Sequence, residues 1–342
     1  MPKILYGVSP IGLGHATRDI VIIEELKRQG ADVKLFSGGK AAEFIRGQGY
    51  AVEDIVVDPV PSVSKGEMRR VALWYIRSWV AYRRTFRRTE RLFDDYSPDI
   101  VVGDEEFTGI GVAERRGKKR IFISDELMLG FGRTWLSKKL EGRVERWYRR
   151  LQDTVDLLII PDKGSDSGNR RFVGPIVRPR SGDCAEIRRR QSLPDGRFVL
   201  FSTSGSGIGK ELLDAVIASL RDSRLKGVPL VVTGNRGPRI VMDRILDLGI
   251  VSQNQDLIAC ADLVVSTAGK STIDEARAAG TPIIAIPIRH HAEQERNAAE
   301  LGYNADDVRR LADLMASKIS QRGPPLNFDG EVAASRLILS LS

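Results

Sequence analysis

The sequence is poor in the residues from which disulfide frameworks and metal sites are built. It contains 2 cysteines and 3 histidines among 342 residues. Two cysteines, Cys184 and Cys260, are too few for a disulfide framework, and neither lies in a Cys-x-x-Cys motif or a Cys/His cluster. His290 and His291 are adjacent, but no third ligand lies at a useful spacing. We therefore expect no metal site.

Long apolar runs are also absent. No segment approaches the roughly 18 to 20 consecutive apolar residues that a membrane-spanning helix requires. The chain enters a predicted strand directly after Met1-Pro-Lys, which leaves no room for a signal peptide. Acidic residues are fewer than basic ones, which gives a formal net charge of +8. We expect a cytoplasmic protein with an acidic partner, which is nucleic acid, an anionic membrane or a phosphorylated small molecule.

Short β-branched runs alternate with helical patterns along nearly the whole chain. This alternation is typical of an α/β fold with parallel sheets and crossover helices. The predicted strands are Lys3–Val8, Asp32–Phe36, Asp99–Val102, Arg120–Ser124, Leu157–Ile160, Phe198–Ser202, Pro229–Thr233, Asp262–Ser266 and Pro282–Ile286.

The length predicts two domains, at about 150 residues each. The polar, turn-rich stretch 177–196 is the best candidate for a boundary. We therefore predict an N-terminal domain over 1–177 and a C-terminal domain over 178–324. The remainder, 325–342, contains an amphipathic helix that could pack on either domain. In parallel sheets, ligands bind outside the carboxyl ends of the strands, so the turns that follow strands matter most.

The first such turn, 7–18, reads GVSPIGLGHATR. After Gly12 and Gly14, the third glycine of a dinucleotide fingerprint is replaced by Thr17, so this is a poor Rossmann motif. The turn instead presents His15. The positive end of the helix dipole disfavours an imidazolium there, and a neutral imidazole can accept a proton. A role in capping or packing the turn is the alternative.

Two small-residue loops follow strands in the second half, at Ser204–Gly207 and Gly269–Thr272. Neither is a P-loop, because the required first glycine is missing. Exposed backbone N–H groups at two helix N-termini could nevertheless hold a diphosphate. Glu275 has two interpretations of equal weight: it closes a capping box with Thr272, or it accepts the hydroxyls of a ribose.

The segment from Leu248 to Pro287, LGIVSQNQDLIACADLVVSTAGKSTIDEARAAGTPIIAIP, resembles the donor-binding half of MurG-like glycosyltransferases of family 28, and QERNA at 294–298 continues the match. Phe172–Arg178 resembles the hinge entry of that family, and Gly12–His15 resembles its N-terminal turn. The resemblance implies the GT-B fold, in which two Rossmann-like domains face each other across a cleft.

The resemblance also implies a nucleoside-diphosphate sugar donor, with UDP favoured, and no cofactor. It places the base at Ile250 or Val251, the ribose at Glu275 and the sugar ring at Glu293 and Gln294. The diphosphate would lie against Ser204, Gly205, Ser206, Gly207, Gly269, Lys270, Ser271 and Thr272.

The acceptor side departs from the family. Where MurG-type enzymes carry a His-Glu pair after a strand, this chain has Ser124-Asp125-Glu126, and another acidic cluster, Asp104-Glu105-Glu106, follows the preceding strand. We expect Asp125 to act with His15, and Asp104 and Glu105 to contact a polar acceptor or orient His15. Helix capping explains these carboxylates about as well.

Arginines alternate with aromatic residues in two stretches, 68–93 and 135–150. This pattern suits an anionic lipid interface or a lipid-phosphate acceptor, and it would also suit nucleic acid. A solvated basic face above an aromatic core stripe is the simplest alternative.

Together these features predict an inverting, metal-independent glycosyltransferase that moves a sugar from a nucleoside-diphosphate sugar to a hydroxyl acceptor. A lipid-linked acceptor would bring the protein to the inner face of the membrane as a peripheral protein. A nucleotide-sugar hydrolase of the same fold is the alternative. A nucleic-acid-binding protein is disfavoured, because it would not need two phosphate-binding turns.

Overall fold

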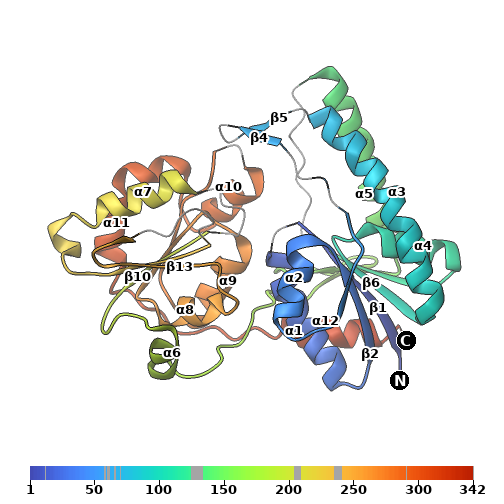
Figure 1. Ribbon diagram of the computed structural model, residues 1–342, viewed down its shortest axis with the longest axis horizontal. Coiled ribbons are helices and arrows are strands. Elements are labelled where there is room, and N and C mark those ends of the chain that lie inside the picture. The colour runs from blue at the N-terminus through green and yellow to red at the C-terminus, as the bar shows by residue number, and fades with distance from the viewer. Residues whose placement is uncertain are drawn as a thin grey trace. The chain divides into compact units, whose positions relative to one another are not determined.

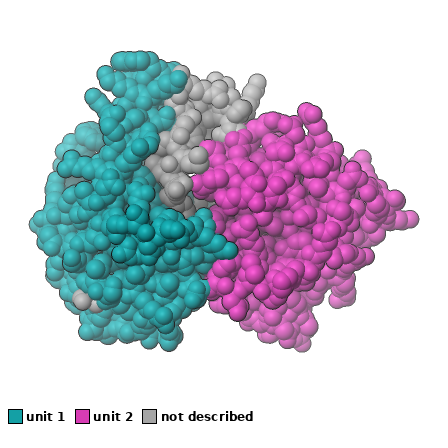
Figure 2. Space-filling model, turned by 180° about the vertical axis from the view of Figure 1, so that it is seen from behind, with its two compact units in different colours: residues 1–176, 329–342 teal, residues 177–328 magenta. Residues whose placement is uncertain are grey.

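The computed structural model describes residues 1–11, 13–57, 59, 62–64, 67–69, 71–124, 134–203, 209–234, 241–289 and 291–341. The chain divides into two compact units (Figures 1 and 2). Unit 1 comprises residues 1–176 and 329–342, and unit 2 comprises residues 177–328. Each unit contains its own parallel sheet and its own hydrophobic core.

Unit 1 is built on a seven-stranded sheet with the order β3-β2-β1-β6-β7-β8-β9, in which every pair is parallel. The first strands run outward from β1 in one direction, and the chain then crosses to the other side of β1 to form β6. The point where the order reverses therefore lies between β1 and β6. The strands are β1 Lys3–Val8, β2 Asp32–Ser37, β3 Val52–Asp54, β6 Ile100–Asp104, β7 Lys119–Ile123, β8 Leu157–Ile160 and β9 Arg170–Phe172.

Helices cover both faces of this sheet, which is why β1 is apolar at successive positions. Ile4 and Tyr6 pack with the core formed by α1, α2 and α12, whereas Leu5 packs with the core beneath α3, α4 and α5. The helices are α1 Gly14–Arg28, α2 Gly39–Gly47, α3 Val71–Tyr96, α4 Phe107–Arg116, α5 Trp135–Thr154 and α12 Gly330–Leu339, and a hairpin joins β4 Ser62–Ser64 to β5 Glu67–Arg69.

The sequence left open which domain receives the last helix. In the structure α12 packs on α1 of unit 1, where Ala334 and Ile338 are buried and the hydroxyl of Ser335 donates to the carbonyl of Ile22 at 3.4 Å. The chain therefore begins and ends in the same unit.

Unit 2 is built on a six-stranded sheet with the order β12-β13-β11-β10-β14-β15. Only the β12–β13 pair is antiparallel. Its order reverses between β10 and β14. The strands are β10 Val199–Ser202, β11 Leu230–Thr233, β12 Val241–Met242, β13 Ile245–Gly249, β14 Leu263–Ser266 and β15 Ile283–Ala285.

In unit 2, α6 precedes the first strand, and helices then follow β10, β13, β14 and β15. The helices are α6 Cys184–Gln191, α7 Lys210–Ser219, α8 Asn254–Cys260, α9 Lys270–Ala279, α10 Ala292–Ala299 and α11 Leu311–Lys318, with 3-10 turns at Ser223–Leu225 and Ala305–Arg310.

Each predicted strand is present, with ends that agree or are shifted by at most two residues, so the predicted α/β class is confirmed. One part of the cysteine argument needs correction. Cys184 on α6 and Cys260 on α8 are joined in a single disulfide, with a Cα–Cα distance of 5.4 Å. Two cysteines are too few for a framework, but the fold brings these two together across 76 residues of sequence.

Candidate active site

The site in unit 1 lies where the strand order reverses, between β1 and β6. Val8, the last residue of β1, is in register with Asp104, the last residue of β6. The turn after β1 leads into α1, whose second residue is His15. Two elements far apart in the sequence therefore bring His15 and Asp104 to the same edge of the sheet, which is the position where ligands bind in such sheets.

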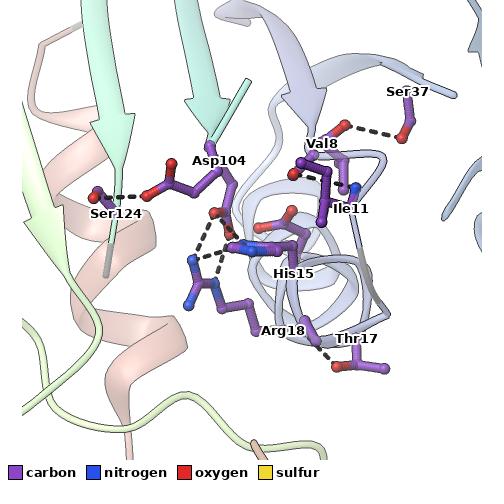
Figure 3. A network of polar contacts seen from close by, with 12 residues as sticks. Val8, Ile11, His15, Thr17, Arg18, Ser37, Asp104 and Ser124 are labelled. Atoms are coloured by element: carbon purple, nitrogen blue, oxygen red, sulfur yellow. Dashed lines mark hydrogen bonds and ion pairs between the residues drawn. The ribbon is translucent and has the colours of Figure 1, made fainter. Parts of the chain in front are cut away.

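The imidazole of His15 contacts the carboxylate of Asp104 directly (Figure 3). Nδ1 of His15 lies 2.9 Å from Oδ1 of Asp104. The guanidinium of Arg18, one turn further along α1, donates to both oxygens of the same carboxylate, each at 2.6 Å. Asp104 is fully buried, whereas the side chain of His15 retains 22% exposure. The histidine is thus held by a buried carboxylate and remains partly exposed.

The ionised state of Asp104 fixes how the imidazole is held. Burial alone would raise the pKa of this carboxyl, but the charge of Arg18 and the hydrogen bonds from Arg18 and His15 hold it well below its usual value. A carboxylate can only accept hydrogen bonds, so Nδ1 of His15 donates to Asp104, and Nε2 carries the lone pair whenever the ring is neutral. Nη2 of Arg18 also lies 3.1 Å from Nδ1, but its bond to Asp104 is shorter.

The other two carboxylates after β6 have different roles. Glu106 is the N-cap of α4 and accepts from the backbone N–H groups of Thr108 and Gly109, both at 2.8 Å. Glu105 adopts a left-handed backbone conformation with φ of 46°, which is costly for a residue with a side chain. Capping therefore explains Glu106 but neither Asp104 nor Glu105.

Glu105 accepts hydrogen bonds from the hydroxyls of Ser124 at 2.8 Å and Tyr148 at 2.7 Å. Burial raises the pKa of Glu105 to about 7, and the charge of His15 and the two hydroxyls oppose the increase only in part. A carboxyl that titrates near neutral pH beside His15 and Asp104 can either accept or donate a hydrogen bond to a polar ligand.

In unit 2, Glu275 lies within α9 and is buried. The N-cap of α9 is Gly269, and no side chain caps this helix, so the capping box of Thr272 with Glu275 does not form. Instead Arg178 approaches Oε1 of Glu275 to 3.3 Å and donates to the carbonyl of Ser252 at 2.7 Å. Burial raises the pKa of Glu275, and the charge of Arg178 opposes this increase.

The turn from β14 to α9 is held in a strained form. Ala268 has φ of 61°, and its carbonyl accepts from the buried amide of Asn297 at 3.1 Å. The hydroxyl of Thr267 is buried and has no hydrogen-bond partner in the described part of the chain. The turn ends at the N-terminus of α9, where the positive end of the helix dipole attracts an anion.

The remaining residues predicted to bind the donor occupy varied positions. Lys270 pairs with Asp274 at 2.7 Å, and Ile250 is 53% exposed at the end of β13. Gln294 is buried and accepts from the backbone N–H of Ile288 at 3.1 Å, whereas Glu293 is exposed on the first turn of α10. Ser271, Thr272 and Val251 are half-buried, and Gly14 is the first residue of α1. Gly12, Asp125, Ser204, Gly205, Ser206 and Gly207 lie outside the described residues.

Both units match families of known glycosyltransferases. Residues 240–320 match the glycosyltransferase family 28 C-terminal domain, and residues 2–131 match a glycosyl transferase family 1 model. An uncharacterized glycosyltransferase of Methanosarcina mazei is 27% identical over 336 residues, which cover 88% of this chain and 85% of the relative. The UDP-N-acetylglucosamine--N-acetylmuramyl-(pentapeptide) pyrophosphoryl-undecaprenol N-acetylglucosamine transferase of an Exiguobacterium species is 24% identical, covering 85% of this chain and 82% of the relative.

Solved structures show the same fold. A glycosyltransferase of kitacinnamycin aligns with a TM-score of 0.70 at 16% identity over 99% of both chains. MurG of Acinetobacter baumannii aligns with a TM-score of 0.56 at 14% identity, over 99% of this chain and 100% of that one. The protein is a glycosyltransferase with the GT-B fold, and its second unit contains a family 28 C-terminal domain. Family 28 implies that this glycosyltransferase uses a nucleotide-sugar donor.

Sequence reasoning missed several residues of the glycosyltransferase that the structure brings into the two sites. Arg18 lies one helical turn from His15, so the i, i+3 spacing could have indicated that it shares a partner with the histidine. Arg178 and Tyr148 reach their sites from 97 and 43 residues away, and no local pattern predicts such contacts.

The arginine- and aromatic-rich stretches of the glycosyltransferase form α3 and α5, which pack against each other (Figure 1). Tyr75 and Phe93 are buried, and Tyr82 and Phe86 are half-buried, so most of the aromatic stripe belongs to the core. Trp79 faces outward. In the part of the chain that the structure describes, no helix has both the length and the apolar character needed to span a bilayer.

Proposed function

We propose that this glycosyltransferase transfers a sugar, with inversion, from a UDP-sugar to a hydroxyl acceptor, with His15 as the general base. The observation that carries the proposal is the pairing of a partly exposed His15 with the buried, ionised Asp104. Asp104 orients the ring and stabilises the imidazolium that forms, as the carboxylate does in other acid–base pairs with histidine.

The reaction is a single displacement. Nε2 of His15 removes the proton of the acceptor hydroxyl as its oxygen attacks the anomeric carbon. The new bond joins that oxygen to the anomeric carbon, and the bond from the anomeric carbon to the phosphate oxygen breaks. The electron pair of that bond leaves with UDP, and the proton ends on the imidazole, which is paired with Asp104.

We assign the donor to the turns of unit 2. Glu275 would accept the ribose hydroxyls through its carboxylate, and the N-terminus of α9 at Gly269 would face the diphosphate. The helix dipole stabilises negative charge as it develops on the leaving group, which supports a metal-independent reaction. The exposed Ile250 and the neighbouring Val251 remain the proposed contacts of the base, and Glu293 and Gln294 those of the sugar.

The test of this function is a product assay with His15→Asn. Removal of a general base costs about 10²- to 10⁴-fold in kcat. Arg28→Ala, on the exposed last turn of the same helix, serves as the matched control and should keep full activity. An unchanged kcat in His15→Asn would refute the assignment. Rapid release of free sugar from the donor without any acceptor would favour the hydrolase.

We also propose that the acceptor is lipid-linked and that α3 and α5 contact an anionic membrane. Tyr75 donates to Glu141 at 3.4 Å, and Tyr82 contacts Trp147 edge-to-face with ring centroids 6.3 Å apart, so the two helices run in the same direction with their N-terminal halves together. Large apolar side chains are exposed on these N-terminal halves: Leu73, Ile76, Trp79, Val80, Trp135 and Leu136.

Basic side chains accompany this apolar surface. The guanidinium of Arg83 lies over the ring of Trp79 at 5.1 Å, and the ammonium of Lys139 lies over Trp135 at 4.9 Å. Exposed tryptophans next to cations are typical of surfaces that insert into the headgroup region of an anionic bilayer. We therefore propose peripheral binding to the inner face of the membrane.

Cosedimentation with vesicles tests this contact. We expect binding to phosphatidylglycerol vesicles and not to phosphatidylcholine vesicles. The double variant Trp79→Ser, Trp135→Ser should lose binding, whereas Leu326→Ser, which changes an exposed apolar residue of unit 2, should keep it. Equal sedimentation of the double variant would exclude this surface, and salt-sensitive oligonucleotide binding in place of vesicle binding would favour nucleic acid.

A further inference from the structure

The disulfide of unit 2 fastens the segment by which the chain enters that unit. This entry segment comprises residues 177–183 and leads into α6, whose first residue is Cys184. The disulfide joins Cys184 to Cys260, the last residue of α8, and α6 packs on α8 (Figure 1). The proposed transfer of a sugar does not use this bond.

Contacts at three successive positions fasten the entry segment along α8. Arg178 donates to the carbonyl of Ser252, just before α8 begins, at 2.7 Å. The backbone N–H of Ser181 donates to the carboxylate of Asp256 at 2.8 Å, and the disulfide follows at Cys260. The entry segment and α8 therefore run alongside each other in the same direction, because each step along one is matched by a step along the other.

The middle contact and the start of α8 are both firmly held. Asp256 is fully buried and accepts from the backbone N–H and the hydroxyl of Ser181, so releasing the entry segment would cost this carboxylate two hydrogen bonds. Asn254, the first residue of α8, bonds to Thr233 and Ser202 at the ends of β11 and β10. The helix is thus a fixed support for the entry segment.

The entry segment also reaches the proposed donor site. Arg178 approaches Oε1 of Glu275 through Nε and Nη2, each at 3.3 Å, and both side chains are almost fully buried. Through the carbonyl of Ser252, the same guanidinium contacts the loop that follows Ile250 and Val251, the proposed contacts of the base. Arg178 therefore links the group proposed for the ribose to the loop proposed for the base.

The disulfide can be reduced from the side of Cys184. The side chain of Cys184 is half-buried, whereas that of Cys260 is buried. A guanidinium nitrogen of Arg180 lies 3.6 Å from Sγ of Cys184, and a cation at this distance attracts a thiolate. Accessible disulfides are the ones that exchange with thiols in solution.

We propose that the Cys184–Cys260 disulfide is a redox site that controls donor affinity, and that Arg178 is the positioning residue through which it acts. Two thiols cannot stay at bonding distance, and Cys260 belongs to the fixed α8, so reduction displaces Cys184 and loosens the entry segment. Arg178 then has to be ordered again when the donor binds, which lowers the affinity. The effect on the donor rests on the proposed function of Glu275, whereas the loosening does not.

The reductant is a dithiol. One of its thiolates attacks Sγ of Cys184, the S–S bond breaks, and the electron pair leaves with Sγ of Cys260. The second thiolate then attacks the mixed disulfide and releases Cys184. The two protein sulfurs gain two electrons and two protons in all, and the dithiol is oxidised to a disulfide.

Hydrogen exchange tests the loosening without any ligand. Treatment with dithiothreitol should lower the protection of the Ser181 amide at least about tenfold, because the bond to Asp256 opens more often. The amide of Val264 in β14, which donates to the carbonyl of Pro282, should keep its protection. Equal protection of the Ser181 amide before and after reduction would overturn the proposal.

Calorimetry with UDP tests the control of affinity. We expect UDP to bind about 5- to 20-fold more weakly to the reduced protein than to the oxidised one. Cys184→Ser should bind UDP as weakly as the reduced protein, with or without dithiothreitol. An affinity that is unchanged or higher after reduction would overturn the proposal, because the disulfide would then stabilise the fold without acting on the donor.

A further variant tests the route through Arg178. In Arg178→Met, reduction should change the affinity for UDP by less than about twofold, because the contact that reduction disturbs is already missing. Arg189→Met, on the exposed face of α6, should keep the full effect of reduction. A full effect in Arg178→Met would overturn the positioning role. If UDP binds neither form of the native protein, the proposed donor site fails, and hydrogen exchange still decides whether the disulfide holds the entry segment.

Discussion

Both units contain a sheet whose strand order reverses at one point, but the residues at that point differ between the units. In unit 1 the edge between β1 and β6 carries ionisable side chains, of which Asp19 and Asp104 are fully buried and His15 is partly exposed. In unit 2 the corresponding edge between β10 and β14 carries small residues, as in the turn at Ala268 and Gly269 that leads into α9. The same architecture thus presents side-chain charge in one unit and peptide dipoles in the other.

Close packing in unit 2 explains its small residues. Gly234 has φ of 80°, and a Cβ atom there would lie 2.4 Å from the carbonyl oxygen of Thr203. Gly209 has φ of 148°, and a Cβ atom there would lie 2.8 Å from Cγ2 of the same threonine. Larger residues would be strained and would push the turns apart. Backbone N–H groups can bind an anion without placing a formal charge in the protein, which suits a binding role.

Buried charges in unit 1 cost desolvation energy, so they require partners. Arg18 neutralises Asp104, and the side chain of His15 remains partly exposed. This arrangement suits the proposed transfer of a proton to the imidazole. The comparison therefore supports the proposal that unit 1 carries the chemistry and unit 2 binds the donor, and each proposed role predicts a different kinetic defect.

The largest effect is expected for Asp104→Asn. Loss of the carboxylate charge removes the group that orients His15 and stabilises its imidazolium, so kcat should fall about 10²- to 10⁴-fold. Affinity for the donor, measured by calorimetry, should stay within about threefold, because the proposed donor site lies in unit 2. A donor affinity reduced as strongly as kcat would contradict the division of labour.

Asp104→Asn also leaves the buried Arg18 without its counter-charge, which should lower the free energy of unfolding by about 3 kcal/mol or more. Denaturation curves therefore accompany the kinetics. Asp99→Asn on the exposed start of the same strand is the control for both measurements and should behave as the native protein.

A smaller defect, in donor affinity and not in kcat, is expected for Glu275→Gln in unit 2. A hydrogen bond to a charged group contributes about 1.5 to 3 kcal/mol, so donor affinity should fall about 10- to 100-fold with little change in kcat at saturating donor. Stabilisation of the protein by UDP in thermal melts should decrease in parallel. The exposed Glu295 on α10 provides a matched control, Glu295→Gln. A loss in kcat alone would place Glu275 in the chemistry instead.

Much of the fold could be predicted from the sequence because buried parallel strands are apolar along their whole length. Val199–Ser202 and Leu263–Ser266 stand out for this reason. The strands that were missed are β3, β4, β5, β9, β12 and β13. Of these, β3 and β9 are short, lie at the edges of the sheet of unit 1 and contain charged residues such as Glu53 and Arg170. Edge strands are half-exposed, so their sequence carries little hydrophobic signal.

The candidate site could be predicted only where one local turn carries it. His15 follows a strand in a glycine turn, and its position could be read directly. The partner of His15 could not be predicted, because three carboxylates stand in a row at the end of β6. Only the backbone conformation distinguishes the capping Glu106 from the buried Asp104 and the strained Glu105. Arg178 reaches Glu275 over 97 residues, which no spacing rule predicts.

The smallest expected effect is the pH dependence that Glu105 gives to the stability of the protein. Its pKa is raised by burial from 4.5 to about 7, so between these values the folded protein binds more protons at this group than the unfolded chain does. The contribution of Glu105 to stability therefore falls as the pH rises through this window and stays low above it. Glu105→Gln removes the ionisation while its amide oxygen can still accept from Ser124 and Tyr148.

Above neutral pH, Glu105→Gln should be more stable than the native protein by about 1 to 3 kcal/mol, and the gain should vanish toward the acid end of the window. Urea denaturation at a series of pH values measures this difference. Glu43→Gln, on the exposed face of α2, should show no such pH dependence. A gain that is constant with pH would mean that Glu105 titrates normally, and the acceptor side of unit 1 would then contain one fewer group able to donate a hydrogen bond near neutral pH.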